Sequence, residues 1–385
     1  MFSLFHFFFS FFLLYTNNLL ALALTSPQDI SALKAFKASI KPSSIQPFSC
    51  LASWDFTADP CAFPRRTHFT CGIVCSSDST RVTQLTLDPA GYSGQLTPLI
   101  SQLTSLTMLD LSDNYFFGSV PSSISSLVNL QTLNLRSNSF SGSLPESITK
   151  LKSLHSLDLA HNYLSGYLPK SMNLMSSLGR LDISYNKLTG PLPRLPYNLR
   201  ELALKANSLS GLLSKSSFDR LTQLEVVELG ENSFTGTLES WFFLLPALQQ
   251  VDLANNSLTR VEISRPANGE SDLVAVDLGF NKIEGNVPAN FAAYPLLSSL
   301  SLRYNRLRGA ILLEFSQKKS LRRLFLDGNF LIGKPPPAFF NGGGPVAGSL
   351  GDNCLQACPG SSQLCTPSQK PSSMCKQAYG GKPRS

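Results

Sequence analysis

The chain has 385 residues and a formal net charge of +7, with 43% of its residues hydrophobic. This length is ample for a large buried core and by itself suggests two or three domains. The basic balance favours acidic partners. Charge alone does not exclude nucleic acid, but the compartment inferred below does.

Residues 1–23 are predicted to be a secretory signal peptide. They contain the apolar run Phe7 to Leu14 and then Ala21-Leu22-Ala23, which is similar to a small-residue cleavage site. The segment has no Lys or Arg, so a retained membrane anchor stays open as the alternative. No second run of about 20 apolar residues follows, so we expect no transmembrane segment in the mature chain. The predicted location is the extracellular space or the cell wall.

Residues 24–80 are predicted to form an N-terminal cap. An amphipathic helix there places five side chains near one face: Ile30, Leu33, Phe36, Lys37 and Ile40. Apart from Lys37 this face is apolar, and it should cover the open end of the first repeat.

The eight cysteines form two quartets, one before and one after the central part of the chain: Cys50, Cys61, Cys71, Cys75, Cys354, Cys358, Cys365 and Cys375. Even numbers at both ends of a secreted chain predict disulfides, although each quartet allows three connectivities. The C-x₃-C spacings leave zinc as a competing interpretation, which the signal peptide disfavours. We predict no metal site and no cofactor.

Residues 81–337 are predicted to form about eleven repeats. The frame L-x-x-L-x-L-x-x-N-x-L recurs at steps of 21 to 25 residues, with these asparagines: Asn114, Asn138, Asn162, Asn186, Asn207, Asn232, Asn256, Asn281, Asn305 and Asn329. A fixed period of this length is the signature of a solenoid, in which each repeat buries its apolar face against the next. The first repeat has Ala90 in the Asn place.

Each repeat is predicted to contain one strand and one structural Asn. In residues 154–162, Leu157 and Leu159 alternate with polar residues, which is the period of a half-buried strand. One strand per repeat gives a parallel sheet, and the chain must then bend away from it. The Asn carboxamide carries both a donor and an acceptor, so it can satisfy the inward backbone groups of that bend. A ligand site made by these Asn residues is the disfavoured alternative.

Most repeats continue with Gly four residues after the Asn and many with Pro seven after it, as in Gly142 and Pro145. Gly permits a positive φ or a close approach, and Pro favours an extended return segment. The whole pattern resembles the plant-specific class of extracellular leucine-rich repeats. The elements Ser53-Trp54, Asp59-Pro60-Cys61 and Gly72-Ile73-Val74-Cys75 resemble the N-terminal cap of that class.

The resemblance implies an α/β solenoid, a right-handed curved superhelix with a parallel β-sheet on its concave face and cysteine-containing caps. It also implies the disulfides Cys61–Cys75 and Cys50–Cys71, although Cys71 stands where that cap more often has another residue. Residues 338–385 are expected to be a linker, a C-terminal cysteine flank similar to that of some relatives, and a disordered tail from Lys376.

Two repeats depart from the pattern. The step from Asn186 to Asn207 is three residues short and crowded with prolines, so its return segment should be extended. Between Asn256 and Asn281, Arg260 and Ile263 stand in the Gly and Pro places, and residues 265–272 are polar. A functional loop and ordinary variation of the convex side both stay open for this repeat.

The outward strand positions form the predicted binding face, because a solenoid holds them in parallel rows. The places just before the Asn supply the candidate ligand-binding residues: Arg136, His161, Tyr185, Lys205, Glu231, Phe280, Arg303 and Tyr304. Between the leucines of L-x-L stands an acidic row, read mainly as structural: Asp110, Asp158, Asp182, Glu228, Asp252 and Asp277. A basic cluster from Arg303 to Arg323 is either a solvated face or a dock for an acidic partner.

Catalysis finds no support in motifs, since G-x-S-x-G, a P-loop and H-E-x-x-H are all missing. Asn255 is the acceptor of the one N-glycosylation sequon. The sequence therefore predicts a non-enzymatic recognition protein for a peptide or protein ligand in the plant cell wall space, receptor-like or part of a co-receptor, with a receptor kinase as a further partner. The alternatives, by resemblance, are an inhibitor of a microbial polygalacturonase, a wall-degrading enzyme, and a structural wall protein that binds pectin through its basic surface.

Overall fold

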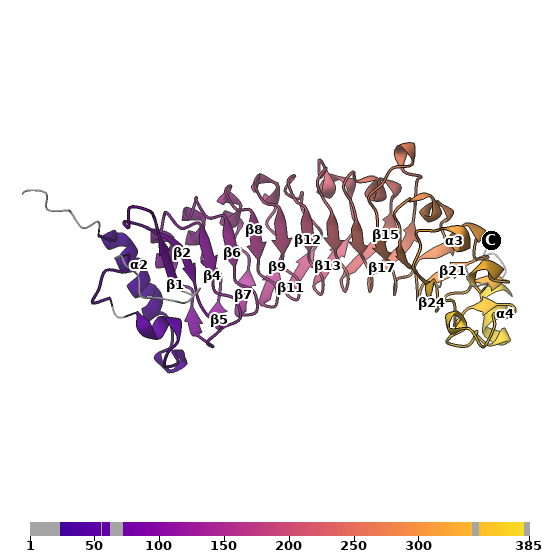
Figure 1. The fold of residues 1–385 in the computed structure, drawn as a ribbon, viewed down its shortest axis with the longest axis horizontal. Helices are drawn as coiled ribbons and strands as arrows, with labels where there is room; N and C mark the ends of the chain where they lie inside the picture. The colour runs from indigo at the N-terminus through magenta and orange to yellow at the C-terminus, as the bar shows by residue number, and fades with distance from the viewer. Residues whose placement is uncertain (1–23, 55, 62–71, 341–345, 381–385) are drawn as a thin grey trace, which may run out of the picture.

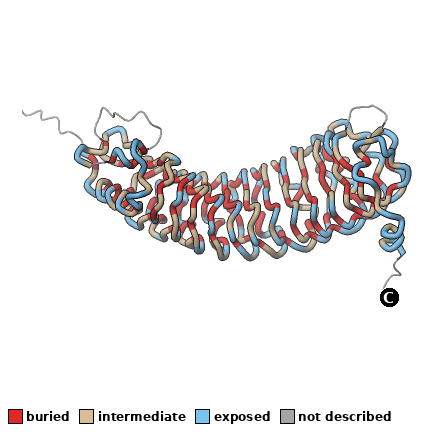
Figure 2. Tube along the Cα trace, turned by 90° about the horizontal axis from the view of Figure 1, so that it is seen from below, coloured by how far each residue is buried: buried red, intermediate tan, exposed pale blue. Residues whose placement is uncertain are grey.

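The computed structural model describes residues 24–54, 56–61, 72–340 and 346–380. The predicted signal peptide and Cys71 lie outside these residues. The chain forms one long coil whose turns lie side by side from the N-terminal to the C-terminal end (Figure 1). Seen from below, the coil is an arc with a concave and a convex side (Figure 2).

The concave side is a continuous sheet of 13 strands. Its first strand is antiparallel to the second, and every later pair is parallel. In order the strands are β1 (Gly72–Cys75), β2 (Val82–Thr86), β4 (Met108–Asp110), β6 (Thr132–Asn134), β8 (Ser156–Asp158), β10 (Arg180–Asp182), β12 (Glu201–Ala203), β14 (Val226–Glu228), β16 (Gln250–Asp252), β18 (Ala275–Asp277), β20 (Ser299–Ser301), β22 (Arg323–Phe325) and β24 (Ala347–Ser349). The middle residue of each regular strand is a buried Leu or Val, which explains the register.

The segments after each Asn pair into a second sheet, which the repeat pattern did not predict. It contains eight strands: β3 (Ser93–Gln95), β5 (Tyr115–Gly118), β7 (Ser139–Ser143), β9 (Tyr163–Gly166), β11 (Lys187–Gly190), β13 (Ser208–Gly211), β15 (Ser233–Leu238) and β17 (Ser257–Val261). After β17 the sheet is interrupted. Two separate pairs follow, formed by β19 (Glu284–Asn286) with β21 (Arg306–Arg308) and by β23 (Ile332–Gly333) with β25 (Cys354–Leu355).

Short helical turns return the chain to the next repeat. They are η3 (Pro98–Gln102), η4 (Ser122–Ser126), η5 (Glu146–Lys150), η6 (Met172–Leu174), η7 (Lys215–Phe218), η8 (Ser240–Leu244), η9 (Ala267–Gly269), η10 (Ala289–Ala293), α3 (Leu313–Gln317) and η11 (Pro337–Phe339). The short repeat between β11 and β12 has no such turn. Its three prolines, Pro191, Pro193 and Pro196, favour the extended path that the shorter repeat needs.

The Asn ladder connects neighbouring turns through hydrogen bonds. Asn162 accepts the N–H of Phe140 at 2.9 Å and donates to the carbonyls of Leu135, Leu159 and Ala160 at 2.9, 3.2 and 3.2 Å. All ten predicted asparagines repeat this scheme with small variations. Each carboxamide therefore satisfies backbone groups of two turns at once.

The ladder extends one turn beyond the point where the sequence pattern was expected to end. Asn353 accepts the N–H of Leu331 at 3.0 Å and donates to Leu326, Leu350 and Gly351. This turn was missed because β24 has Gly348 where other strands have Leu or Val. A Cβ at Gly348 would lie 1.8 Å from the Leu324 carbonyl oxygen, so the close approach of the last strand requires glycine.

The N-terminal cap combines α2 (Pro27–Ala38), η1 (Pro42–Ser44) and η2 (Cys50–Ser53). The buried face of α2 is Asp29, Ala32, Leu33 and Phe36, which differs from the predicted face because Ile30 and Lys37 are only half-buried. Asp29 is 0% exposed. It accepts the N–H of Val82 at 2.7 Å and pairs with Arg81 at 3.0 Å. A buried carboxylate thus anchors the cap to the first parallel strand.

Disulfides reinforce both ends. Cys61 is bonded to Cys75 in the N-terminal cap. In the C-terminal flank, which contains η12 (Gln363–Cys365) and α4 (Ser372–Gly380), Cys354 is bonded to Cys375 and Cys358 to Cys365. Residues 376–380 belong to α4, so the expectation of a disordered tail from Lys376 was wrong for this part. The pairing of Cys50 with Cys71 stays a prediction, since Cys71 lies outside the described residues.

Candidate ligand-binding face

The residue just before each ladder Asn has a left-handed backbone. His161, Tyr185, Glu231, Phe280 and Tyr304 all have φ between 50° and 56°. The chain turns here from the concave sheet towards the second sheet, so these side chains stand along one edge of the concave face. Non-glycine residues seldom adopt this conformation, and here the hydrogen bonds of the adjacent turns impose it.

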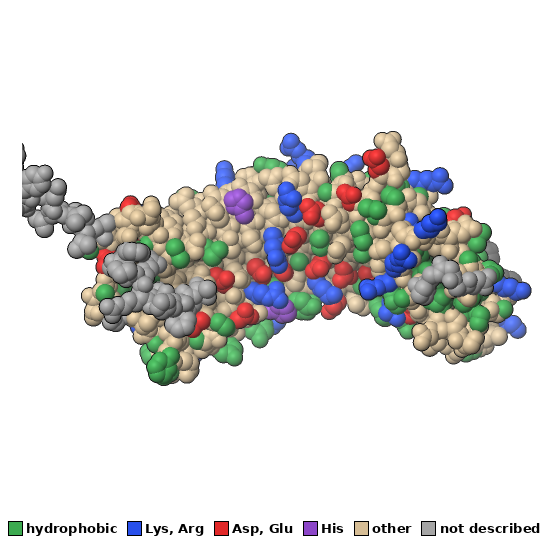
Figure 3. Space-filling model, in the orientation of Figure 1, with side chains coloured by type: hydrophobic (Ala, Val, Ile, Leu, Met, Phe, Trp, Pro, Cys, Tyr) green, Lys and Arg blue, Asp and Glu red, His purple; other side chains and the backbone are tan. Residues whose placement is uncertain are grey.

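Four of the predicted residues line one hollow of about 350 Å³ on the concave face, which we call the acidic hollow. Its lining is Arg136, His161, Asp182, Ser184, Tyr185, Lys205, Glu228 and Asp252. The rings of His161 and Tyr185 are stacked, with centroids 4.3 Å apart. Figure 3 shows Asp and Glu side chains gathered in the middle of the concave side, with Lys and Arg beside them. The hollow is thus lined by a stacked aromatic pair and by carboxylates.

Two cations cross strands to reach these carboxylates. Arg136 lies 4.0 Å from Asp158 and 3.7 Å from Asp182. Lys205 lies 3.5 Å from Glu231 and 3.2 Å from Asp252, which is two strands away. The reach to Asp252 crosses Gly230, where a Cβ would lie only 2.8 Å from a carboxylate oxygen of Asp252. Sequence reasoning missed this glycine, whose missing side chain opens the path.

The acidic row has a structural role along most of its length. One carboxylate oxygen of Asp158 accepts the backbone N–H of Ala160 at 3.1 Å. Asp182, Asp252 and Asp277 likewise each accept the backbone N–H of the residue two positions later. The side-chain oxygen of Asn134, in the same row, accepts the backbone N–H of Arg136 at 3.1 Å in the same way. The second carboxylate oxygen of Asp158, Asp182 and Asp252 lies near Arg136 or Lys205.

The crowded carboxylates of the acidic hollow favour protons or cations. Burial raises the pKa of Glu228 in the hollow, and the charges of Asp252 and Asp182 raise it further. Burial and the charge of Asp182 also raise the pKa of Asp158, which Arg136 connects to the hollow, while the Ala160 N–H and Arg136 oppose that shift. Burial also opposes the charge of Lys205, but Asp252 and Glu231 outweigh it and raise the pKa of the amine. The middle of the face therefore keeps its lysine charged and would gain from a further positive group.

Of the other four predicted residues, Glu231 pairs with Lys205 beside the acidic hollow. The remaining three belong to a second group, the arginine–aromatic cluster, made of Phe280, Arg303, Tyr304, Phe325 and Asp327. The Phe280 and Tyr304 rings are stacked at 4.7 Å, and each is about two-fifths exposed (44% and 40%). The Arg303 guanidinium lies over Phe280, Tyr304 and Phe325 at 5.8, 5.7 and 5.1 Å, and it pairs with buried Asp327 at 3.0 Å. Phe325 and Asp327 were not predicted, although Phe325 stands in a usually acidic place.

The basic cluster of the sequence does not form one patch. Arg303 and Arg323 line a concave hollow of about 340 Å³ together with Glu228, Asp252 and Asp277. Arg306 and Arg308 instead lie in β21 of the second-sheet side. The Lys318 amine donates to the Tyr294 carbonyl, and burial lowers its pKa. Residues adjacent in sequence are thus distributed around the turn.

Asn255 stands in the same edge row as Glu231 and Phe280, with an exposed side chain and a φ of 54°. Any glycan there would lie between the acidic hollow and the arginine–aromatic cluster. Within the described residues, no helix is long and apolar enough to cross a membrane.

The repeated strand, Asn ladder and curved sheet define a leucine-rich-repeat solenoid. The chain belongs to the leucine-rich-repeat proteins. Leucine rich repeat models match residues 105–127, 129–188, 197–258 and 320–341, and the leucine rich repeat N-terminal domain model matches residues 26–65.

Among its relatives, Receptor-like protein 7 of Arabidopsis thaliana is 32% identical over 146 residues, which cover 37% of this chain and 14% of that protein. The crystal structure of PEPR1–AtPEP1 matches with a TM-score of 0.77 and 32% identity over 85% of this chain and 45% of that one. The plant peptide hormone receptor RGFR1, in complex with RGF2, matches with a TM-score of 0.62 and 29% identity over 71% and 48%. The chain thus spans less than half of each.

Proposed function

We propose that the concave face binds an extended peptide or a peptide-like segment of a protein, and that the chain is a non-catalytic extracellular recognition protein, receptor-like or part of a co-receptor. The observation that carries this proposal is the pair of exposed stacks, His161 on Tyr185 and Phe280 on Tyr304, each beside a charged group. The similarity to PEPR1–AtPEP1 and to RGFR1 with RGF2 supports a peptide as the ligand class.

The two aromatic stacks are preorganised for binding. Each stack is held by strands whose backbone is fixed by the ladder, so little side-chain freedom is lost when a ligand covers it. Aromatic and arginine side chains of this kind are the usual anchors of interfaces. The acidic hollow would accept a basic side chain of the ligand, because its carboxylates exceed the cations that reach them.

The test is the alanine substitution of Tyr185, Phe280 and Tyr304. The ligand would be identified by proximity labelling with the secreted chain as bait, and its affinity would be measured by calorimetry. We expect each substitution to weaken binding by about 2 kcal/mol where the ring is fully covered. Tyr167→Ala, a 67% exposed tyrosine in the return segment after β9, is the matched control and should leave the affinity unchanged.

Unchanged affinity in all three variants, with an intact fold, would exclude the concave face. A direct inhibition assay with a microbial polygalacturonase separates the alternative function. Inhibition that survives all three substitutions would favour an inhibitor that uses another surface.

A further inference from the structure

The second sheet is interrupted between β17 and β19, although the concave sheet beneath is continuous. Within the described residues, one backbone hydrogen bond joins the two segments, from the Lys282 N–H to the Leu258 carbonyl at 2.9 Å. Beyond it the strands separate, while β17 stays paired with β15 and β19 with β21. Two strand edges therefore face each other without pairing.

At this break, the residue at the glycine place of the repeat differs from those of the neighbouring repeats. Gly236 and Gly285 bend their strands with φ of 80° and 101°, but Arg260 has no positive φ. Strand β17 continues to Val261, which pairs with Leu238 after a register shift between Gly236 and Thr237, whereas β19 turns at Gly285. The two paths thus separate at a departure from the repeat pattern.

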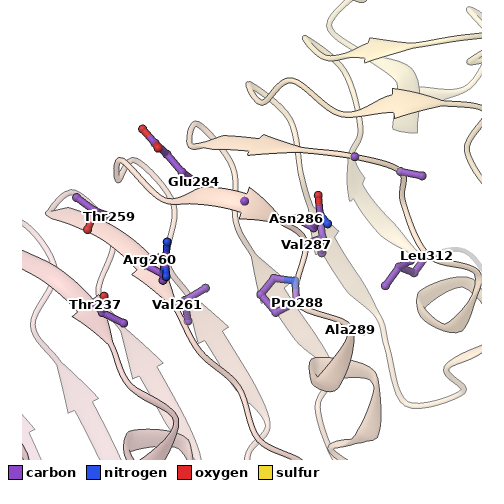
Figure 4. A pocket seen from close by; sticks show the side chains of 13 residues that line it. Thr237, Thr259, Arg260, Val261, Glu284, Asn286, Val287, Pro288, Ala289 and Leu312 are labelled. Atoms are coloured by element: carbon purple, nitrogen blue, oxygen red, sulfur yellow. The ribbon is translucent and has the colours of Figure 1, made fainter. Parts of the chain in front are cut away.

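The separation leaves a groove of about 990 Å³, shown in Figure 4. Thr237, Thr259, Arg260 and Val261 line one wall, and residues 284–289 line the other, with Leu312 beyond them. Gly285 confirms the gap independently. A Cβ there would meet nothing within 4 Å, whereas one at Gly309 would meet Asn286 of the preceding turn at 2.6 Å.

The groove is held open from the convex side. The Tyr294 hydroxyl donates to the Ser264 carbonyl at 3.0 Å, and the Asn290 amide donates to the Ile263 carbonyl at 2.7 Å. Tyr294 is 0% exposed, so this anchor is part of the core. The interruption is therefore a constructed feature with a fixed width, and not a frayed edge.

We propose that this groove binds an extended segment of a partner protein, which adds as a strand to the edge of β17 or β19. Strand edges present backbone donors and acceptors that an extended peptide complements directly. Arg260 is exposed on one wall, whereas Glu284 on the other wall pairs with Arg306 at 3.2 Å, so the segment should carry an acidic residue opposite Arg260. Val261, Pro288 and Leu312 offer apolar contact to one side chain between them. The site is separate from the concave face and independent of its ligand.

The experiment is a selection of phage-displayed linear dodecapeptides on the full secreted chain and on two variants. Arg260→Gly restores the repeat pattern and should let β17 bend and close the groove. Ala289→Tyr fills the groove from its wall without changing the strand edges. We expect the selected peptides to bind both variants about tenfold or more weakly. Ser122→Tyr, at the equivalent place of a turn whose second sheet is intact, should bind them like the original chain.

Two further measurements locate the contact. Peptides N-methylated at alternate residues should lose binding about tenfold, because methylation removes backbone donors. Hydrogen exchange should show peptide-dependent protection at residues 259–261 or 284–286. The proposal is overturned if no peptide is enriched, if Arg260→Gly and Ala289→Tyr bind as well as the original chain, or if an oligosaccharide in place of a peptide protects these residues.

Discussion

The two sheets are built from the same repeats, yet one is continuous and the other is broken. The concave sheet depends on a buried Leu or Val in each strand and on the Asn ladder, and both persist through every regular turn. The second sheet is broken between β17 and β19, where Arg260 stands in the glycine place, and again between β21 and β23, where Gly309 and Gly333 keep their positive φ. A repeat protein can therefore vary one side of its coil while the other side stays intact.

The comparison also separates two kinds of surface. On the concave face, a ligand would contact side chains that are held by a continuous sheet. At the interruption, a partner would instead contact the backbone N–H and C=O groups of the strand edges.

The continuous sheet should be most vulnerable at its N-terminal end. Asp29→Ala leaves Arg81 and the Val82 N–H without their buried acceptor. Breaking one partner of such a pair typically costs about 3–5 kcal/mol. Urea unfolding followed by the fluorescence of Trp54, a buried residue of the cap, measures the loss. Gln28→Ala, at an exposed neighbour, is the control, and an equal effect of both substitutions would refute the anchor.

The stability contributed by each ladder Asn should not depend on the interruption of the second sheet. Asn256 and Asn281 lie on either side of β17 and make the same four bonds, to the N–H groups of Phe234 and Leu258 and to three carbonyls each. Alanine at either place should cost about 1–3 kcal/mol in denaturant unfolding, because buried backbone groups lose their partner.

Exposed Asn129, whose amide donates to the Thr104 carbonyl at 2.9 Å at the surface, serves as the control for a hydrogen bond between turns outside the core. Its alanine variant should lower stability less than the two ladder variants do, by about 0.5 kcal/mol. A clearly smaller loss at Asn281 than at Asn256 would mean that the interruption weakens the concave sheet as well.

The left-handed row at the edge of the concave sheet offers a stabilising change. Ala206 has a φ of 53°, a conformation that costs an L-residue free energy but glycine almost none. Ala206→Gly should therefore raise the free energy of unfolding by up to about 1 kcal/mol. Ala203→Gly, three residues earlier in β12, should instead lower it by about 0.5–1 kcal/mol. Equal signs for the two variants in thermal unfolding would contradict the account.

The smallest effect concerns pH. Since burial raises the pKa of Asp158 above 3.8, the fold disfavours its charge, and the penalty is complete above the folded pKa and gone below 3.8. Asp158→Asn should keep the bond to the Ala160 N–H, as Asn134 does for Arg136, and should remove the penalty. We expect a higher thermal midpoint than the original chain at pH 7 and the same midpoint below pH 3.8.

Asp78 provides a control of opposite sign. Hydrogen bonds from Ser76 and Thr80 lower its pKa below 3.8, so its contribution to stability is present above 3.8 and is lost as the pH falls through the folded pKa. Asp78→Asn should therefore lower the midpoint at pH 7. A lower midpoint for Asp158→Asn as well would show that its ion pair with Arg136 outweighs the desolvation.

The local pattern of this chain was sufficient to predict the solenoid, its concave sheet and the role of each ladder Asn from Asn114 to Asn329. These features depend on residues a few positions apart, and the repeat places them identically each time. The sequence predicted that the candidate ligand-binding residues lie in rows along the concave face. Their grouping into the acidic hollow and the arginine–aromatic cluster was not predicted, since Lys205 reaches Asp252 only because Gly230 lies between them in space.

Tertiary structure alone decided the remaining features. Asp29 is buried because Arg81, 52 residues away, supplies the charge and Val82, the next residue, supplies the N–H that it needs. Asn353 continues the ladder because β24 pairs with β22 through Gly348, which lies too close to Leu324 for a side chain. The residue Arg260 was visible as an irregularity, but whether the second sheet would close over it depended on where β19 and the Tyr294 anchor hold the next turn. Such outcomes rest on contacts between distant residues, which sequence periodicity does not encode.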